Sequence, residues 1–110
     1  MCSSDLLVKT IFLTTLLAAA SASAQLSGDK IKIGVLTDMN GPYSALAGPG
    51  SVKAAQMAAD AFMKSHPEYA GKVEVIGADH QGKADVATNK ALEMIERDGV
   101  DAIFDTPTSS

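Results

Sequence analysis

The stretch from Lys30 to Met63, KIKIGVLTDMNGPYSALAGPGSVKAAQMAADAFM, decides the fold of this 110-residue chain. Residues 30–37 are rich in β-branched and other apolar side chains, which predicts a β-strand. Residues 38–50 hold three glycines and two prolines and predict a loop. Apolar residues then recur at helical spacing from Val52 until His66-Pro67, where proline disfavours further helix. The stretch therefore predicts one strand–loop–helix unit.

Residues 72–105 repeat this step. The segment 72–79 (KVEVIGAD) predicts a second strand, and 83–98 predicts a second helix that Gly99 ends as the residue after its C-cap. Residues 100–105 (VDAIFD) predict a third strand. The order β-α-β-α-β implies an α/β fold with parallel strands joined by right-handed crossovers, the start of a doubly wound, Rossmann-like sheet.

Helix boundaries and buried faces follow from the same patterns. Ser51 is a candidate N-cap for the first helix, unless that helix begins earlier with Pro49 in its first turn. Two helices on three parallel strands leave one helix-sized patch of sheet uncovered, so we expect a piece of a larger protein. The predicted buried faces are Val52, Ala55, Ala59, Phe62 and Met63 on the first helix and Ala84, Ala87, Ala91, Met94 and Ile95 on the second.

The first 24 residues have the three parts of a cleaved export signal. Lys9 supplies the positive charge, residues 11–20 (IFLTTLLAAA) form a short apolar core, and Ala22-Ser23-Ala24 is a small-x-small cleavage site. The apolar run is shorter than the roughly 20 residues that span a bilayer. We therefore expect a soluble, exported mature protein that begins near Gln25 and lacks Cys2, the only cysteine of the chain.

Charge and motifs exclude several classes of function. The net charge is −4, and no basic cluster interrupts the interspersed charges, so nucleic-acid binding is not expected. A Walker-type GK[ST], a dinucleotide fingerprint directly after the first strand, a G-x-S-x-G elbow and a Cys/His pair are all absent from the sequence. No cofactor and no enzymatic activity are predicted.

The three strands end in polar pairs, Thr37-Asp38, Asp79-His80 and Asp105-Thr106. Parallel strands bring these ends to one edge of the sheet, where open α/β folds bind ligands. The aspartates resemble a metal-binding acidic cluster, but the turn-forming role of aspartate is the favoured reading, and no metal is predicted. A catalytic role for His80 would need a partner that the sequence does not identify.

Two segments at this edge are candidate ligand contacts. Tyr43 either stacks on a ligand or packs against the prolines of its own loop. Free N–H groups at the helix start near 48–51 favour an anion, although Ser51 and water can satisfy them equally well. The final T-P-T-S-S offers hydroxyl and N–H groups for a carboxylate, or is an ordinary Ser/Thr-rich turn.

Taken in order, the export signal, IKIGVLTDMNGPYSALAGPGSVKAAQMAADAF and VEVIGADHQGKADVATNKALEMIERDGVDAIFDTPTSS resemble type I periplasmic substrate-binding proteins. The chain is similar to the branched-chain amino acid (leucine/isoleucine/valine-binding) family of ABC transport receptors. The resemblance implies a signal peptide, 1–24, and a truncated amino-terminal lobe, 25–110, of a two-lobed protein. It also implies that Ser109 holds a ligand carboxylate, that Thr108 and Pro107 line the same wall, and that Tyr43 to Leu46 form the rim.

The implied function is capture of a small carboxylate-bearing solute, without chemistry, by a monomer that delivers it to an inner-membrane permease. Asp105-Thr106-Pro107 departs from the glycine that amino acid binders often have near this position. G-P-G-S-V and the D-x-P-T-S-S ending look more like a branch that takes aromatic acids, so both ligand classes stay open. The alternatives are a ligand-sensing domain of a regulator or receptor with this fold, and a small exported α/β enzyme that uses His80.

Overall fold

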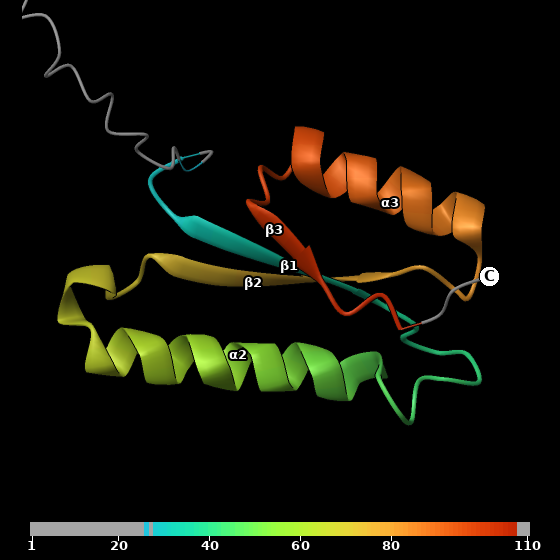
Figure 1. The fold of residues 1–110 in the computed structure, drawn as a ribbon, viewed down its shortest axis with the longest axis horizontal. Helices are drawn as coiled ribbons and strands as arrows, with labels where there is room; N and C mark the ends of the chain where they lie inside the picture. The colour runs from blue at the N-terminus through green and yellow to red at the C-terminus, as the bar shows by residue number, and fades with distance from the viewer. Residues whose placement is uncertain (1–25, 27, 108–110) are drawn as a thin grey trace, which may run out of the picture.

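The computed structural model describes Leu26 and residues 28–107, and Figure 1 shows their fold. The elements in chain order are β1 (Ile31–Thr37), α2 (Gly48–Ser65), a 3-10 helix (Pro67–Tyr69), β2 (Val73–Asp79), α3 (Ala84–Glu96) and β3 (Ala102–Phe104). The strands form one parallel sheet in the order β2-β1-β3. This confirms the α/β class and the β-α-β-α-β order. The predicted signal peptide lies outside the described residues.

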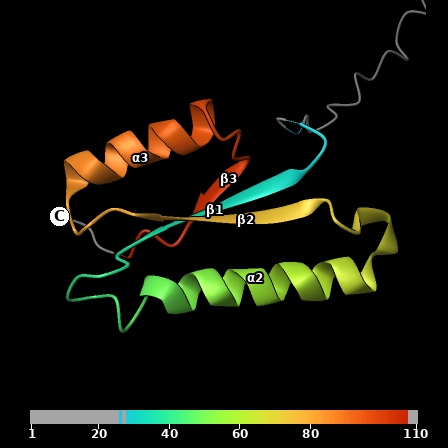
Figure 2. The ribbon, with the colours of Figure 1, turned by 180° about the vertical axis from the view of Figure 1, so that it is seen from behind.

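The two helices lie on opposite faces of the sheet, as both views show (Figures 1 and 2). Side chains alternate between these faces along each strand. On the α3 face, Leu36, Met94 and Val100 form the buried core, joined by the half-buried Ile76, Ala78, Ala87, Ala91 and Ile103. β1 is the central strand and has a helix on each of its two faces, which explains why it is nearly continuously apolar.

α2 begins one turn before Ser51. Ala47 is the N-cap, Pro49 lies in the first turn, and the Ser51 N–H donates to the Ala47 carbonyl at 3.2 Å. The earlier start that the sequence allowed is therefore confirmed, and Ser51 is not the cap. The C-cap is His66, next to proline, as predicted.

β3 is half as long as predicted because Asp101 ends the backbone ladder. The Asp101 N–H donates to the Lys32 backbone carbonyl at 2.8 Å. The Lys32 N–H, however, donates to the side chain of Asp101, to Oδ2, at 2.9 Å. Val100 is buried in the core instead of pairing in the sheet. α3 also ends earlier than predicted, with Arg97 as C-cap, so Gly99, at φ +67°, lies two residues after the cap.

The predicted helix faces are right at their centres, but three of their residues are exposed: Phe62 of α2, at 39%, and Ala84 and Ile95 of α3. Ala87, Ala91 and Met94 pack on the sheet, whereas Ala84 and Ile95 are exposed because they lie at the start and the side of the α3 face. Within the described part of the chain, no helix is long and apolar enough to cross a membrane.

Candidate functional site

The carboxyl ends of the strands meet at one edge of the sheet, as the sequence predicted. Thr37, the last residue of β1, pairs with Asp79, the last residue of β2. The loop 38–47 after β1, the turn 80–83 after β2 and residues 105–107 after β3 all leave from this edge (Figure 1). This edge is therefore the candidate site.

Asp38 organises the loop that follows β1. Its side chain is fully buried, and its carboxylate accepts hydrogen bonds from the N–H groups of Gly41 at 2.7 Å and Tyr43 at 3.1 Å. The Ser44 hydroxyl donates to the Gly41 carbonyl at 2.7 Å and tightens the same turn. A Cβ at position 41 would collide with the Asp38 carboxylate, so this turn requires glycine. We call residues 38–47 the rim loop.

Asp79 ties the rim loop to β2. Its carboxylate accepts hydrogen bonds from the Met39 N–H at 3.2 Å, the Asn40 side-chain amide at 3.2 Å and the Gln81 N–H at 2.8 Å. Desolvation by burial acts to raise the pKa of Asp79. The hydrogen bonds from Gln81, Met39 and Asn40 act in the opposite direction and together outweigh desolvation, so the pKa lies below its ordinary value. The ionised carboxylate therefore stabilises the junction of two strand ends.

This lowered pKa predicts a pH dependence of stability. A carboxyl whose folded pKa lies below its unfolded pKa contributes stability above the unfolded value, about pH 4, and loses it as pH falls through the folded value. We expect Asp79→Asn to remove part of the acid-dependent loss in the free energy of unfolding. Urea titrations of both proteins between about pH 6 and pH 2 measure this. Identical pH slopes for the two proteins would contradict it.

His80 has a structural role in the turn after β2. Its side chain is buried, its backbone N–H donates to the Thr37 carbonyl at 3.0 Å, and its Nδ1 accepts the Gly82 N–H at 2.9 Å. An accepting Nδ1 carries no proton, so the bond fixes the ring orientation. Across the residues that the structure describes, no three His, Cys, Asp or Glu side chains are placed to hold a metal ion. Asp38 and Asp79 form turns, the role favoured from the sequence.

The five predicted contact residues divide into three groups. Tyr43 and Leu46 lie in the rim loop and point away from the core, 49% and 86% exposed. Pro107 is exposed at the same edge. Ser109, the predicted carboxylate ligand, and Thr108, predicted to line the same wall, lie outside the described residues. The structure thus places Tyr43, Leu46 and Pro107 at the carboxyl edge of the sheet, and their contact with a ligand stays a prediction.

Sequence reasoning missed two features of this edge. It did not foresee that Asn40 would donate to Asp79 across the strand ends, although a D-M-N-G turn directly after a strand was a usable signal. It also did not foresee that Asp105 has φ +59°, a left-handed conformation that glycine adopts without strain.

Comparisons with known proteins agree on one family. Residues 30–110 match a family described as "Periplasmic binding protein". A periplasmic binding protein from Burkholderia mallei is 41% identical, and a branched chain amino acid ABC transporter periplasmic ligand-binding protein from Burkholderia xenovorans is 43% identical. Both crystal structures have a TM-score of 0.58 and align with 68% of this chain. The chain covers only 20% of each of them, and no curated protein matches it.

Proposed function

This chain belongs to the periplasmic binding protein family, and we propose that it begins the first lobe of a solute receptor for an ABC importer. Residues 1–24 would be the cleaved export signal and 25–110 the first part of the lobe. The mature receptor would work in the periplasm as a monomer and dock on a permease in the inner membrane. It would capture its ligand without chemical change by closing two lobes around it.

The observation that carries this proposal is the construction of the rim loop. Asp38 and Asp79 hold its backbone through hydrogen bonds, while Tyr43 and Leu46 remain exposed. A loop that is ordered in advance loses little conformational entropy when its side chains contact a ligand. Rigid backbone with exposed apolar side chains, at the carboxyl edge of a parallel sheet, suits one wall of a solute cleft.

We propose that the ligand carries a carboxylate, held by Ser109 with Thr108 and Pro107 beside it. Hydroxyl and backbone N–H groups can bind a carboxylate without a cationic side chain. The description of the Burkholderia xenovorans protein supports a branched-chain amino acid, and the resemblance of D-x-P-T-S-S to another branch supports an aromatic acid. No catalytic residue is proposed, since the burial and hydrogen bonds of His80 favour a structural role.

The rim-loop proposal predicts a specific loss of affinity. In the full-length mature protein, Tyr43→Ala is expected to raise the Kd about tenfold, because an aromatic contact worth about 1.4 kcal/mol is lost. Calorimetry with leucine, isoleucine, valine and 4-hydroxycinnamate measures this. Tyr69→Ala is the matched control, because Tyr69 contacts Phe62 at the opposite edge of the sheet. An unchanged Kd for Tyr43→Ala, or an equal loss in the control, would refute this role.

A further inference from the structure

Asn40 and Gly41 form a dipeptide that is chemically prone to deamidation, and both residues lie in the rim loop. In this reaction the backbone nitrogen of the second residue attacks Cγ of the asparagine side chain. Glycine permits the attack best, because it has no Cβ to hinder ring closure. The turn itself requires glycine here, since a Cβ at position 41 would collide with the Asp38 carboxylate. The fold therefore places a reactive dipeptide at the candidate site, where Asn40 is exposed.

Two carboxylates engage the two reacting groups. The Gly41 N–H, which must lose its proton to become the nucleophile, donates to Asp38 Oδ1 at 2.7 Å. A neighbouring negative charge disfavours this loss of a proton. The side-chain amide of Asn40, whose nitrogen Nδ2 is the leaving group, donates to Asp79 Oδ2 at 3.2 Å. Ring closure has to break the first of these hydrogen bonds, and it removes the donor of the second.

We propose that Asn40 is a site of deamidation, that the folded rim loop slows the reaction, and that the product weakens the loop. A bond forms between the Gly41 nitrogen and the Asn40 Cγ, and the bond from Cγ to Nδ2 breaks. The Gly41 N–H proton passes to a solvent base, and Nδ2 takes a proton from water and leaves as ammonia. Water then opens the cyclic imide at either carbonyl, which gives aspartate or isoaspartate. The reaction needs only water.

Either product disturbs the junction between the rim loop and β2. Aspartate at position 40 would place a second carboxylate beside Asp79, where the Asn40 amide now donates, and like charges this close repel each other. Isoaspartate would add a methylene group to the main chain between Met39 and Gly41, whose N–H groups are both held by carboxylates. The modification would therefore loosen the rim loop.

Mass spectrometry of the full-length mature protein tests this, with deamidation of Asn40 followed in its tryptic peptide during incubation in mildly alkaline buffer. Asp38→Ala frees the Gly41 N–H and is expected to raise the rate at least about tenfold, because the loop then opens locally. In urea the two proteins should react equally fast, and faster than the native wild type. Asn89, exposed in α3 and followed by Lys90, is the internal control and should react slowly in both native proteins.

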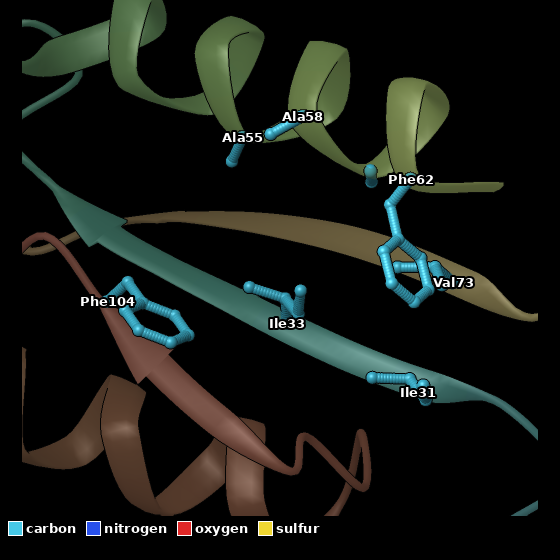
Figure 3. Close-up of a pocket in the computed structure, with 8 residues that line it drawn as sticks. Ile31, Ile33, Ala55, Ala58, Phe62, Val73 and Phe104 are labelled. Atoms are coloured by element: carbon cyan, nitrogen blue, oxygen red, sulfur yellow. The ribbon is translucent and has the colours of Figure 1, made fainter. Parts of the chain in front are cut away.

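Val73→Ala controls for a general loss of stability. Val73 is the first residue of β2, at the opposite end of the strand from Asp79, and it is buried. It lines an apolar pocket together with Phe62 of α2 (Figure 3). The change removes buried volume but leaves both carboxylates of the rim loop in place. The rate at Asn40 should therefore stay within about twofold of the wild type.

Two variants at position 40 test the effect of the product. Asn40→Asp reproduces one product, and Asn40→Ser removes the same amide without adding a charge. Urea unfolding at neutral pH is expected to show a lower midpoint for Asn40→Asp than for Asn40→Ser.

Four outcomes would each overturn the proposal: equal native rates at Asn40 in the wild type and Asp38→Ala, an equal acceleration in Val73→Ala, no reaction in urea, or equal midpoints for the two position-40 variants. None of these readouts involves ligand, so failure here is distinguishable from failure of the receptor proposal.

Discussion

Replacing Asp38 with Ala is expected to lower the free energy of unfolding by about 3 kcal/mol, because hydrogen bonds to a charged acceptor contribute about 1.5–3 kcal/mol each. The fully buried carboxylate holds two N–H groups, those of Gly41 and Tyr43, and Ala would leave both without this acceptor. The rim loop would also lose its fixed conformation. We therefore expect weaker ligand binding together with lower stability, measured by urea unfolding and calorimetry on the full-length protein.

Asp60→Ala is the matched control for this prediction. It removes the same charge from an exposed position of α2, where Asp60 accepts one hydrogen bond from Gln56 at 2.9 Å. A surface change of this kind costs within about 0.5 kcal/mol. If Asp38→Ala lowered the free energy of unfolding no more than Asp60→Ala, the buried Asp38 carboxylate would not be what stabilises the rim loop.

Gly48→Ala is expected to destabilise the protein by about 2 kcal/mol, because insertion into a packed site costs about 1–3 kcal/mol. A Cβ at position 48 would lie 2.6 Å from the backbone carbonyl oxygen of Asp38 and 3.1 Å from the Ser44 Cβ. The first of these atoms is main chain at the end of β1, so it cannot move aside by a rotamer change. The start of α2 or the rim loop would have to shift instead.

Gly50→Ala is the control for Gly48→Ala, in the same first turn of α2. A Cβ at position 50 would meet nothing within 4 Å, and the residue is exposed. Because alanine favours helix over glycine by up to about 1 kcal/mol, this variant should be neutral or slightly more stable than the wild type. Thermal and urea unfolding compare the two. Equal stabilities for both variants would show that the contact with Asp38 imposes no steric demand.

The sequence predicted the sheet well because its strands are short apolar runs with clear ends. Alternation in Lys30 to Thr37 and the Gly/Pro content of the next segment allowed few other interpretations of the first strand–loop–helix unit. The boundaries that differ from the prediction depend on contacts outside the local pattern. α2 starts early because hydrogen-bonded turns of the rim loop lead directly into it. β3 is short because the Asp101 side chain replaces a backbone hydrogen-bond partner. Neither contact is visible in local periodicity.

The site was predictable in position but not in its construction. Parallel strands guarantee that Asp38, Asp79 and Asp105 approach one edge, and the sequence identified all three. Which donors each carboxylate meets depends on the path of the rim loop, so the bond between Asn40 and Asp79 could be found only in three dimensions. Ser109 and Thr108 remain predictions from resemblance, to be tested by ligand binding.

Calorimetry of the full-length mature protein tests the receptor proposal most directly. Leucine, isoleucine, valine and 4-hydroxycinnamate are titrated alongside their methyl esters, which lack the carboxylate charge. We predict a Kd of about micromolar or tighter for at least one acid. Binding of its methyl ester to the wild type, and binding of the acid to Ser109→Ala, should each be at least about 100-fold weaker, since loss of a charge-assisted contact costs several kcal/mol. The proposal would be contradicted if an acid and its ester bound with equal affinity, or if the protein bound none of these acids.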